Sequence, residues 1–231
     1  MSTGDRDTTP RSAAAGAERG VFITFEGGEG SGKSTQIRLL VKRLEDAGLT
    51  VRTLREPGGT VVGEAVRRIL LDPSHAELSV SAEILLYEAS RAQLVDQVIR
   101  PALAAGEVLI CDRFSDSTTA YQGYARGVDL ARIAEMNHAA TGGLVPDRTL
   151  VLDVDPALGI ARATATSADR LESEDLAFHE RVRQGFLAIA EQEPGRVRVI
   201  DASGSAGDVA RRVITALADL PALAPYLGSA R

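Results

Sequence analysis

Short runs of apolar, often β-branched residues alternate along the chain with longer stretches in which apolar residues recur at helical spacing. Strands buried on both faces have nearly continuous apolar sequences, so these runs predict parallel strands joined by helices. The predicted strands are residues 21–26, 50–55, 108–112, 149–154 and 197–201. We therefore expect an α/β fold with a mostly parallel five-stranded sheet, helices on both faces, and ligands beyond the carboxyl ends of the strands.

Residues typical of helix ends lie between the predicted strands. Gly48 is placed to end the first long helix, and Asp155-Pro156 provides a cap and a first residue for a later one. Ser205 and Asp208 precede another periodic stretch at the spacing of a capping box. These signals agree with the hydrophobic periodicity, so two independent observations support the alternation.

The length and composition indicate a single folded domain. The 231 residues are 44% hydrophobic and 25% charged, which is sufficient for one core and requires no second one. We expect the domain to span residues 20–218. Residues 1–19 are small, polar and aperiodic, which predicts a disordered extension, and the two prolines within residues 219–231 predict a loose tail.

The charge and the cysteine content exclude several classes of protein. A formal net charge of -6 argues against a nucleic-acid-binding protein, since such proteins usually carry a basic stripe. The chain has no apolar stretch of the length that a membrane span or a secretory signal needs. Cys111 is the one cysteine and lies in an apolar run, which predicts a buried thiol without an internal disulfide. We expect a cytoplasmic protein that binds neither membranes nor nucleic acid.

A glycine-rich segment directly follows the first predicted strand. It matches the pattern G-x-x-x-x-G-K-[ST] between a strand and a helix, a context that makes a chance glycine-rich turn rare. Its backbone N–H groups and the helix N-terminus would hold phosphates, with Lys33 at the β- and γ-phosphates and the Ser34 hydroxyl on Mg²⁺. The residues expected to hold ATP are Gly27, Gly28, Glu29, Gly30, Ser31, Gly32, Lys33, Ser34 and Thr35.

Further motifs distinguish among the proteins that carry such a loop. The chain has no N-K-x-D motif for guanine and no threonine switch of the GTPase kind. Residues 55–59 read Arg-Glu-Pro-Gly-Gly after the second strand, and residues 112–114 read Asp-Arg-Phe after the third. Residues 117–123 read Ser-Thr-Thr-Ala-Tyr-Gln-Gly. Together with Phe-Glu-Gly at 25–27, these segments resemble bacterial thymidylate kinases over about residues 21–217.

The resemblance implies a P-loop NTPase fold with a short lid at about residues 162–174. It also implies that ATP and dTMP are the substrates, that dTDP is the product, that Mg²⁺ accompanies ATP, and that the protein is a homodimer. The alternative within this fold is another nucleoside monophosphate kinase or a deoxynucleoside kinase. A deoxynucleoside kinase needs a carboxylate base after the second strand, whereas Arg55 suits a phosphate acceptor, although Glu56 follows it. A regulatory protein that binds ATP without turnover is the alternative outside enzymes, and the acceptor-site residues argue against it.

Three residues at the ends of the second and third strands are expected to act on phosphates. Arg55 would clamp the dTMP phosphate, and Arg113 would bridge the donor and acceptor phosphates. Asp112 would hold a Mg²⁺-bound water. The structural alternatives are a surface arginine beside a Pro-Gly turn and an Asp–Arg pair.

A predicted helix carries Tyr87 and Arg91 four residues apart, so both side chains should share a face. By resemblance, Tyr87 stacks on thymine, Arg91 donates to a base carbonyl and Thr118 bonds the ring edge. The resemblance also places Ser117 and Gln122 in the dTMP site. The alternative for two helix residues at this spacing is structural: one packs in the core, and the other forms a salt bridge at the edge of the core.

Two further residues are expected near the sugar. Glu29 opposes phosphate inside an anion-binding loop, so its side chain must point away or serve another purpose; the resemblance implies that it approaches the 3'-hydroxyl. The resemblance also places Tyr121 against C2' of the sugar, where its ring would favour deoxyribose. The alternatives are a solvent-facing carboxylate and a tyrosine that only packs on the core.

The expected lid is poor in arginine. Thr164 and Thr166 stand where family members commonly have arginines, which leaves Arg162 and Arg170 as candidates for the catalytic lid arginine. We expect Arg170 to serve, because it lies in the less helical segment. The histidines show no ligand spacing, so we expect no histidine metal site, and His179 is expected on a helix surface.

Overall fold

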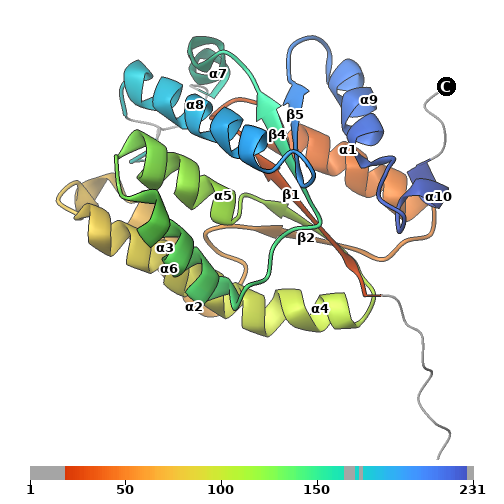
Figure 1. Ribbon diagram of the computed structural model, residues 1–231, viewed down its shortest axis with the longest axis horizontal. Helices are drawn as coiled ribbons and strands as arrows, with labels where there is room; N and C mark the ends of the chain where they lie inside the picture. Colours follow the sequence, from red (N-terminus) through yellow and green to blue (C-terminus); the bar gives the residue numbers. More distant parts are fainter. Residues whose placement is uncertain (1–18, 164–169, 172–173, 228–231) are drawn as a thin grey trace, which may run out of the picture.

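The computed structural model describes residues 19–163, 170–171 and 174–227. In these residues five parallel strands form one sheet in the order β2-β3-β1-β4-β5 (Figure 1). The strands are β1 (Val21–Glu26), β2 (Val51–Arg55), β3 (Val108–Asp112), β4 (Arg148–Asp153) and β5 (Val197–Asp201). The predicted α/β fold is confirmed, and every predicted strand lies within one residue of an observed one.

The central and edge strands differ in burial. β1, β3 and β4 are buried along nearly their whole length, as their apolar sequences predict. β2 pairs with β3 alone, and its residues are exposed or partly exposed. The prediction of a buried run was therefore wrong for β2, because an edge strand lacks a second neighbour.

Helices cover both faces of the sheet (Figure 1). On one face, α1 (Lys33–Asp46), α9 (Ala206–Leu217) and α10 (Ala224–Leu227) pack with alternate residues of β1 in one core cluster. On the other face lie two further clusters, formed mainly by α3, η2 and α4 and by η3 and α8. The bounds of the remaining helices are α2 (Val61–Leu71), η1 (Pro73–His75), α3 (Val80–Leu94), η2 (Val95–Ile99), α4 (Arg100–Ala104), α5 (Ser115–Thr118), η3 (Thr119–Ala125), α6 (Leu130–Thr141), α7 (Pro156–Ala163) and α8 (Leu176–Gln192).

The predicted helix ends are observed. Ser205 and Asp208 form a reciprocal capping box at the start of α9. Asp155 Oδ1 accepts from the backbone of Ala157 at 2.9 Å at the start of α7. Gly48 follows α1 with a φ of 88°, a left-handed conformation that glycine adopts without a Cβ clash. Local sequence thus specifies where these helices begin and end.

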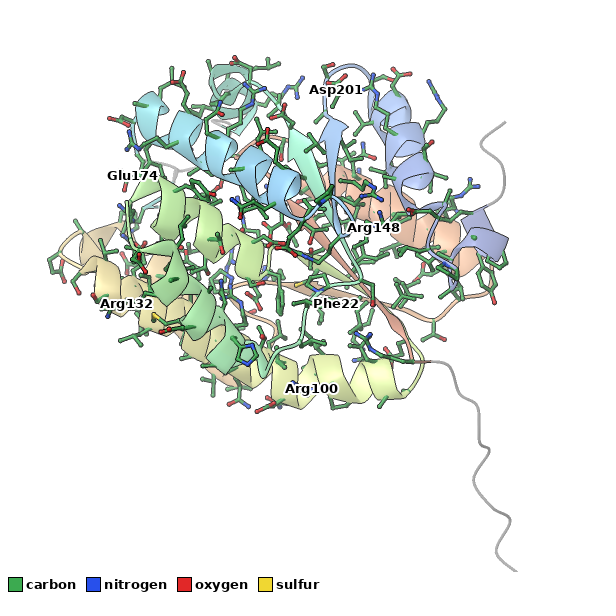
Figure 2. All side chains as sticks on the ribbon, in the orientation of Figure 1. Phe22, Arg100, Arg132, Arg148, Glu174 and Asp201 are labelled. Carbon is green, nitrogen blue, oxygen red and sulfur yellow. The ribbon has the colours of Figure 1, made fainter. Side chains whose placement is uncertain are left out.

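The C-terminal residues up to Leu227 are packed rather than loose, which corrects the prediction for that part of the tail. Leu223 and Leu227 are fully buried in the cluster formed with α1 and α9. Asp219 accepts from Arg148, labelled in Figure 2 at the start of β4, at 2.8 Å. The two prolines do not make this segment loose, because the leucines between and after them pack in the core. The predicted extension, apart from residue 19, lies outside the described residues, as do residues 228–231.

Cys111 is fully buried in β3, as predicted, and burial raises the pKa of its thiol well above the usual value.

Within the described part of the chain, every helix is too short or too polar to cross a bilayer.

The packing of α10 is testable by mutation. Leu227→Ala should lower the free energy of unfolding by about 2–4 kcal/mol, because it removes a buried side chain and leaves a cavity. Tyr226→Ala, on the same short helix but 42% exposed, should change it by less than about 1 kcal/mol. Urea denaturation of both variants measures the contrast, and equal small losses would show that the segment does not belong to the core.

Candidate active site

The phosphate loop fits closely against β4 and α7. A Cβ built on Gly27 would lie 2.5 Å from the carbonyl oxygen of Leu152, and one on Gly30 would lie 1.9 Å from that of Gly159. Both glycines have positive φ, 129° and 62°, which residues with a Cβ rarely adopt. Glycine at these two positions is therefore required by space and by backbone conformation.

The loop ends at a helix N-terminus that is open to an anion. Gly32 caps α1 without a side-chain hydrogen bond, and the first turn of α1 carries no acidic residue. Lys33 Nζ donates to the carbonyls of Gly27 at 3.1 Å and Gly28 at 2.9 Å. Burial lowers the pKa of Lys33, and the neighbouring Arg113 lowers it further. This arrangement concentrates positive potential where the phosphates of a nucleotide would bind.

Arg113 lies in the turn that follows β3. Its φ of 70° makes it the one non-glycine residue with positive φ among those described. Its Nη1 donates to the Gly27 carbonyl at 3.2 Å and to Ser117 Oγ at 3.3 Å, and its Nη2 donates to Glu29. Arg113 thus connects the turn after β3 with the phosphate loop.

The Glu29 side chain binds neighbouring residues of the site, which explains a carboxylate inside an anion-binding loop. Its Oε1 accepts from Arg113 and from the Tyr121 hydroxyl at 3.1 Å. Burial alone would raise the pKa of Glu29, but the charges of Arg113 and Lys33 overcome that effect and lower it to about 2. The carboxylate is therefore ionised at neutral pH and partly offsets the cations of the loop.

Tyr87 and Arg91 of α3 line the same cavity, as their helical spacing predicts. Arg91 is only 1% exposed, and its guanidinium bonds five groups. These groups are Glu56, Glu88, Asn137, the Phe114 carbonyl and Thr118. A guanidinium has five N–H donors, so a base can accept a hydrogen bond from Arg91 only by replacing one of these five groups or by sharing a donor with it.

Arg55 is exposed at the end of β2. Its Nη2 donates to both carboxylate oxygens of Glu64, at 3.1 and 3.0 Å. Exposed ion pairs contribute little energy, so an incoming phosphate can replace Glu64 at small cost. Arg67 lies nearby on α2 and donates to the Pro57 carbonyl at 3.0 Å.

One cavity of about 440 Å³ brings most of the predicted site together. The predicted residues that line it are Glu29, Gly30, Ser31, Gly32, Lys33, Ser34, Thr35, Arg55, Tyr87, Arg91, Asp112, Arg113, Ser117, Thr118, Tyr121 and Gln122. Gly27 and Gly28 line a smaller cavity, which shares Glu29 with the large one.

The two candidate lid arginines are placed differently. Arg162 lines the large cavity from the end of α7. Arg170 instead forms an ion pair with the buried Glu83 and donates to the Leu70 carbonyl at 3.0 Å, so the structure does not place it in the cavity. Thr164, Thr166 and most of the expected lid lie outside the described residues.

Some residues of this region were missed or misplaced by sequence reasoning. Glu56 and Arg67 also line the cavity, and the sequence hinted at this only by placing Glu56 within the Arg-Glu-Pro-Gly-Gly motif and Arg67 on the next helix. Burial raises the pKa of Glu56 to about 7, although Arg91 opposes the rise. The prediction that His179 lies on a surface was wrong, because it is 4% exposed and lines the smaller cavity.

Comparisons with known proteins agree on one family. The family model for thymidylate kinase matches residues 25–213. A thymidylate kinase from a Synechococcus strain is 56% identical over 195 residues, covering 84% of this chain and 92% of that protein. One from Deinococcus radiodurans is 53% identical over 186 residues, covering 80% and 90%. The crystal structure of thymidylate kinase from Ehrlichia chaffeensis superposes with a TM-score of 0.71 at 35% identity, covering 86% of this chain and 99% of that one.

The depressed pKa of Glu29 predicts a contribution to acid stability. A carboxylate whose pKa falls from 4.5 to about 2 on folding stabilises the protein above pH 4.5, by about 3 kcal/mol. That contribution is lost as the pH falls from about 4.5 through 2. The free energy of unfolding of wild type minus that of Glu29→Gln, measured by denaturant titration, should therefore shrink between pH 6 and pH 2.5. A difference that stays constant over this range would contradict the assignment.

Proposed function

This chain belongs to the thymidylate kinase family and phosphorylates dTMP with ATP, and we propose that the large cavity holds both substrates at once. The observation that carries this proposal is that one cavity joins the phosphate loop to the acceptor motifs. In it, Lys33 and the loop would hold the ATP phosphates, and the residues after β2 and β3 would hold dTMP. Parallel strands place these segments at one edge of the sheet, where ligands of such folds bind.

Phosphoryl transfer to dTMP needs positioning and charge neutralisation more than a base. The acceptor is a phosphate oxygen that is ionised at neutral pH, and the transferring group carries spread negative charge. Lys33 lies along the loop, Arg113 bonds the loop from the turn after β3, and Arg55 is exposed at the end of β2. We assign Arg55 to the dTMP phosphate and Arg113 to the space between the two phosphates.

Ser34 and Asp112 suit a Mg²⁺ ion that arrives with ATP. Both line the cavity, and Asp112 Oδ1 is buried without a hydrogen-bond partner among the described residues. A hydroxyl and a carboxylate oxygen are ligands that this hard cation prefers, directly or through water. When bound, Mg²⁺ would neutralise part of the charge on the ATP phosphates.

The base and sugar of dTMP fit the remaining residues. Tyr87 offers a ring for stacking, and Thr118, whose oxygen accepts from Arg91 at 3.1 Å, keeps its proton for an acceptor on the base. Ser117 and Gln122 complete this part of the cavity. Glu29 and Tyr121, bonded to each other, would meet the sugar. The three-part contact of Tyr121 with Glu29, Phe178 and Phe186 supports a packing role as well as a sugar-facing one.

We propose a homodimer in the cytoplasm. Helices α2, α3 and α6 pack together, and the apolar side chains Val61, Val62, Leu85 and Leu130 on them are exposed. Exposed apolar side chains on neighbouring helices suit a surface that another chain covers, and this supports the proposal. Sedimentation equilibrium should then report twice the chain mass of 24.4 kDa, and a mass of one chain would contradict the dimer. The cytoplasmic proposal rests on the single, buried cysteine.

The substrate assignment is tested by ADP release over a panel of acceptors. With Mg²⁺ and ATP, dTMP should give a higher kcat/KM than dCMP, AMP or thymidine. Lys33→Ala should lower kcat by about 10²-fold or more, because a charge aimed at the transferring group is lost. Preference for another acceptor, or near-normal turnover without Lys33, would overturn the proposed site.

The geometry favours Arg162 over Arg170 as the arginine that meets the phosphates from this region. Arg162→Ala should lower kcat more than it raises KM for dTMP, because such a contact contributes mainly in the transition state. Arg170→Ala should leave kcat nearly unchanged and lower stability, because it breaks the pair with Glu83. Steady-state kinetics of the two variants measure these effects, and the reverse pattern would identify Arg170 as the arginine that contacts the phosphates.

A further inference from the structure

Glu26 is a fully buried carboxylate at the end of β1, directly before the phosphate loop. Alternate residues of a strand share a face, so Glu26 lies on the same face as Thr24 and as Phe22, which is labelled in Figure 2. Burial raises the pKa of Glu26 to about 8, and the charge of Asp116 adds to the rise. An apolar residue would fill this space at lower cost, so the interactions of the two carboxylate oxygens require an explanation.

Both oxygens of Glu26 bond the segment after β3. Oε1 accepts from the backbone N–H of Phe114 at 2.7 Å, and Oε2 accepts from the Ser117 hydroxyl at 2.6 Å. Both donors are buried or partly buried, and both distances are at the short end for their type. The residue that introduces the phosphate loop therefore also holds the turn that carries Arg113.

The turn held by Glu26 is one that the chain would not adopt unaided. Arg113 has a φ of 70°, a left-handed conformation that is unfavourable for a residue with a Cβ. The Arg113 N–H donates to the Phe25 carbonyl at 2.9 Å, and the next N–H, of Phe114, donates to Glu26. Consecutive residues of β1 thus fix the two peptide groups on either side of Arg113.

The hydrogen bond between Glu26 and Ser117 also helps to position the guanidinium of Arg113. Ser117 Oγ donates its proton to Glu26 and accepts from Arg113 Nη1 at 3.3 Å. The same Nη1 donates to the Gly27 carbonyl at 3.2 Å. Ser117 Oγ therefore bonds both the Glu26 carboxyl and the Arg113 guanidinium, and this shared contact defines the direction of that Arg113 donor.

We propose that Glu26 is a positioning residue for phosphoryl transfer, which fixes the backbone of Arg113 through Phe114 and its guanidinium through Ser117. The inference rests on the proposed function of Arg113 between the two phosphates. Glu26 lines neither cavity, so it would act on the substrates through Arg113. Its loss should therefore weaken catalysis at saturating substrate and not only the stability of the fold.

The first test compares Glu26→Gln, Glu26→Leu and Ser117→Ala. Glutamine keeps an oxygen for Phe114 but turns an N–H toward Ser117, whereas leucine removes both acceptors. We expect kcat to fall about 10-fold for Gln and about 100-fold for Leu, with smaller increases in KM for ATP and dTMP. Ser117→Ala leaves the buried carboxyl group in place and should lower kcat in the same direction, and the near-isosteric glutamine variant keeps the test valid even if the leucine variant does not fold.

The matched control is Thr24→Val on the same face of β1. It removes the buried hydrogen bond between the Thr24 and Thr149 hydroxyls, at 2.8 Å, without contacting Arg113. This variant should lose thermal stability and keep the wild-type kcat. Equal losses of kcat in Thr24→Val and Glu26→Gln would reduce Glu26 to a packing role and overturn the proposal.

A double-mutant cycle with Arg113→Ala separates the inference from the proposed function on which it rests. If Glu26 acts through Arg113, Glu26→Gln should lower kcat less than about twofold in the Arg113→Ala background. The same 10-fold loss in both backgrounds would overturn the positioning role alone. Near-normal kcat for Arg113→Ala by itself would overturn the proposed function of Arg113, and the role of Glu26 with it.

Discussion

The bonds between Arg113 and the phosphate loop hold the two halves of the site together. The arginine comes from the end of β3, and its partners, the Gly27 carbonyl and Glu29, come from the loop after β1. β1 and β3 are adjacent and parallel, with Phe25 paired to Asp112, so the loop and the turn emerge side by side. The tertiary arrangement of the pocket follows from this pairing, since α1 and α5 start from the same two segments.

This arrangement also balances the charge of the pocket. The whole chain is acidic, with a formal net charge of -6, while the pocket gathers Lys33, Arg55, Arg67, Arg113 and Arg162. Glu29 keeps its negative charge because two of these cations lower its pKa to about 2. A site that receives two phosphorylated nucleotides can therefore remain folded when empty, because its own carboxylates offset part of the repulsion among its cations.

The features of the fold and the site that the sequence could predict are those that nearby residues specify. The strand at 21–26, the glycines of the loop and the capping box at Ser205 are determined by period, conformation and short-range bonds. The grouping of Arg55 with Arg113 was also predictable, because parallel strands expose their carboxyl ends at one edge. Base, sugar and phosphate assignments came from family resemblance and remain proposals.

The parts that sequence could not predict depend on partners far along the chain. Arg170 pairs with Glu83, 87 residues away, and no periodicity connects them. Arg91 was expected to donate to a base carbonyl, and the sequence could not predict that Glu56, Asn137 and the segment after β3 already accept from its guanidinium. Leu227 reaches the core from a segment whose prolines suggested a loose tail. Glu26 looked like the last residue of a strand, and only the fold reveals its bonds to Phe114 and Ser117.

The most direct test of the central claim is a crystal structure with dTMP, Mg²⁺ and a non-hydrolysable ATP analogue. The account predicts Arg113 nitrogens within hydrogen-bonding distance of phosphate oxygens of both nucleotides, with Phe114 N–H still on Glu26. A complex in which Arg113 bonds only Glu29 and the Gly27 carbonyl, with both phosphates held by other groups, would contradict it.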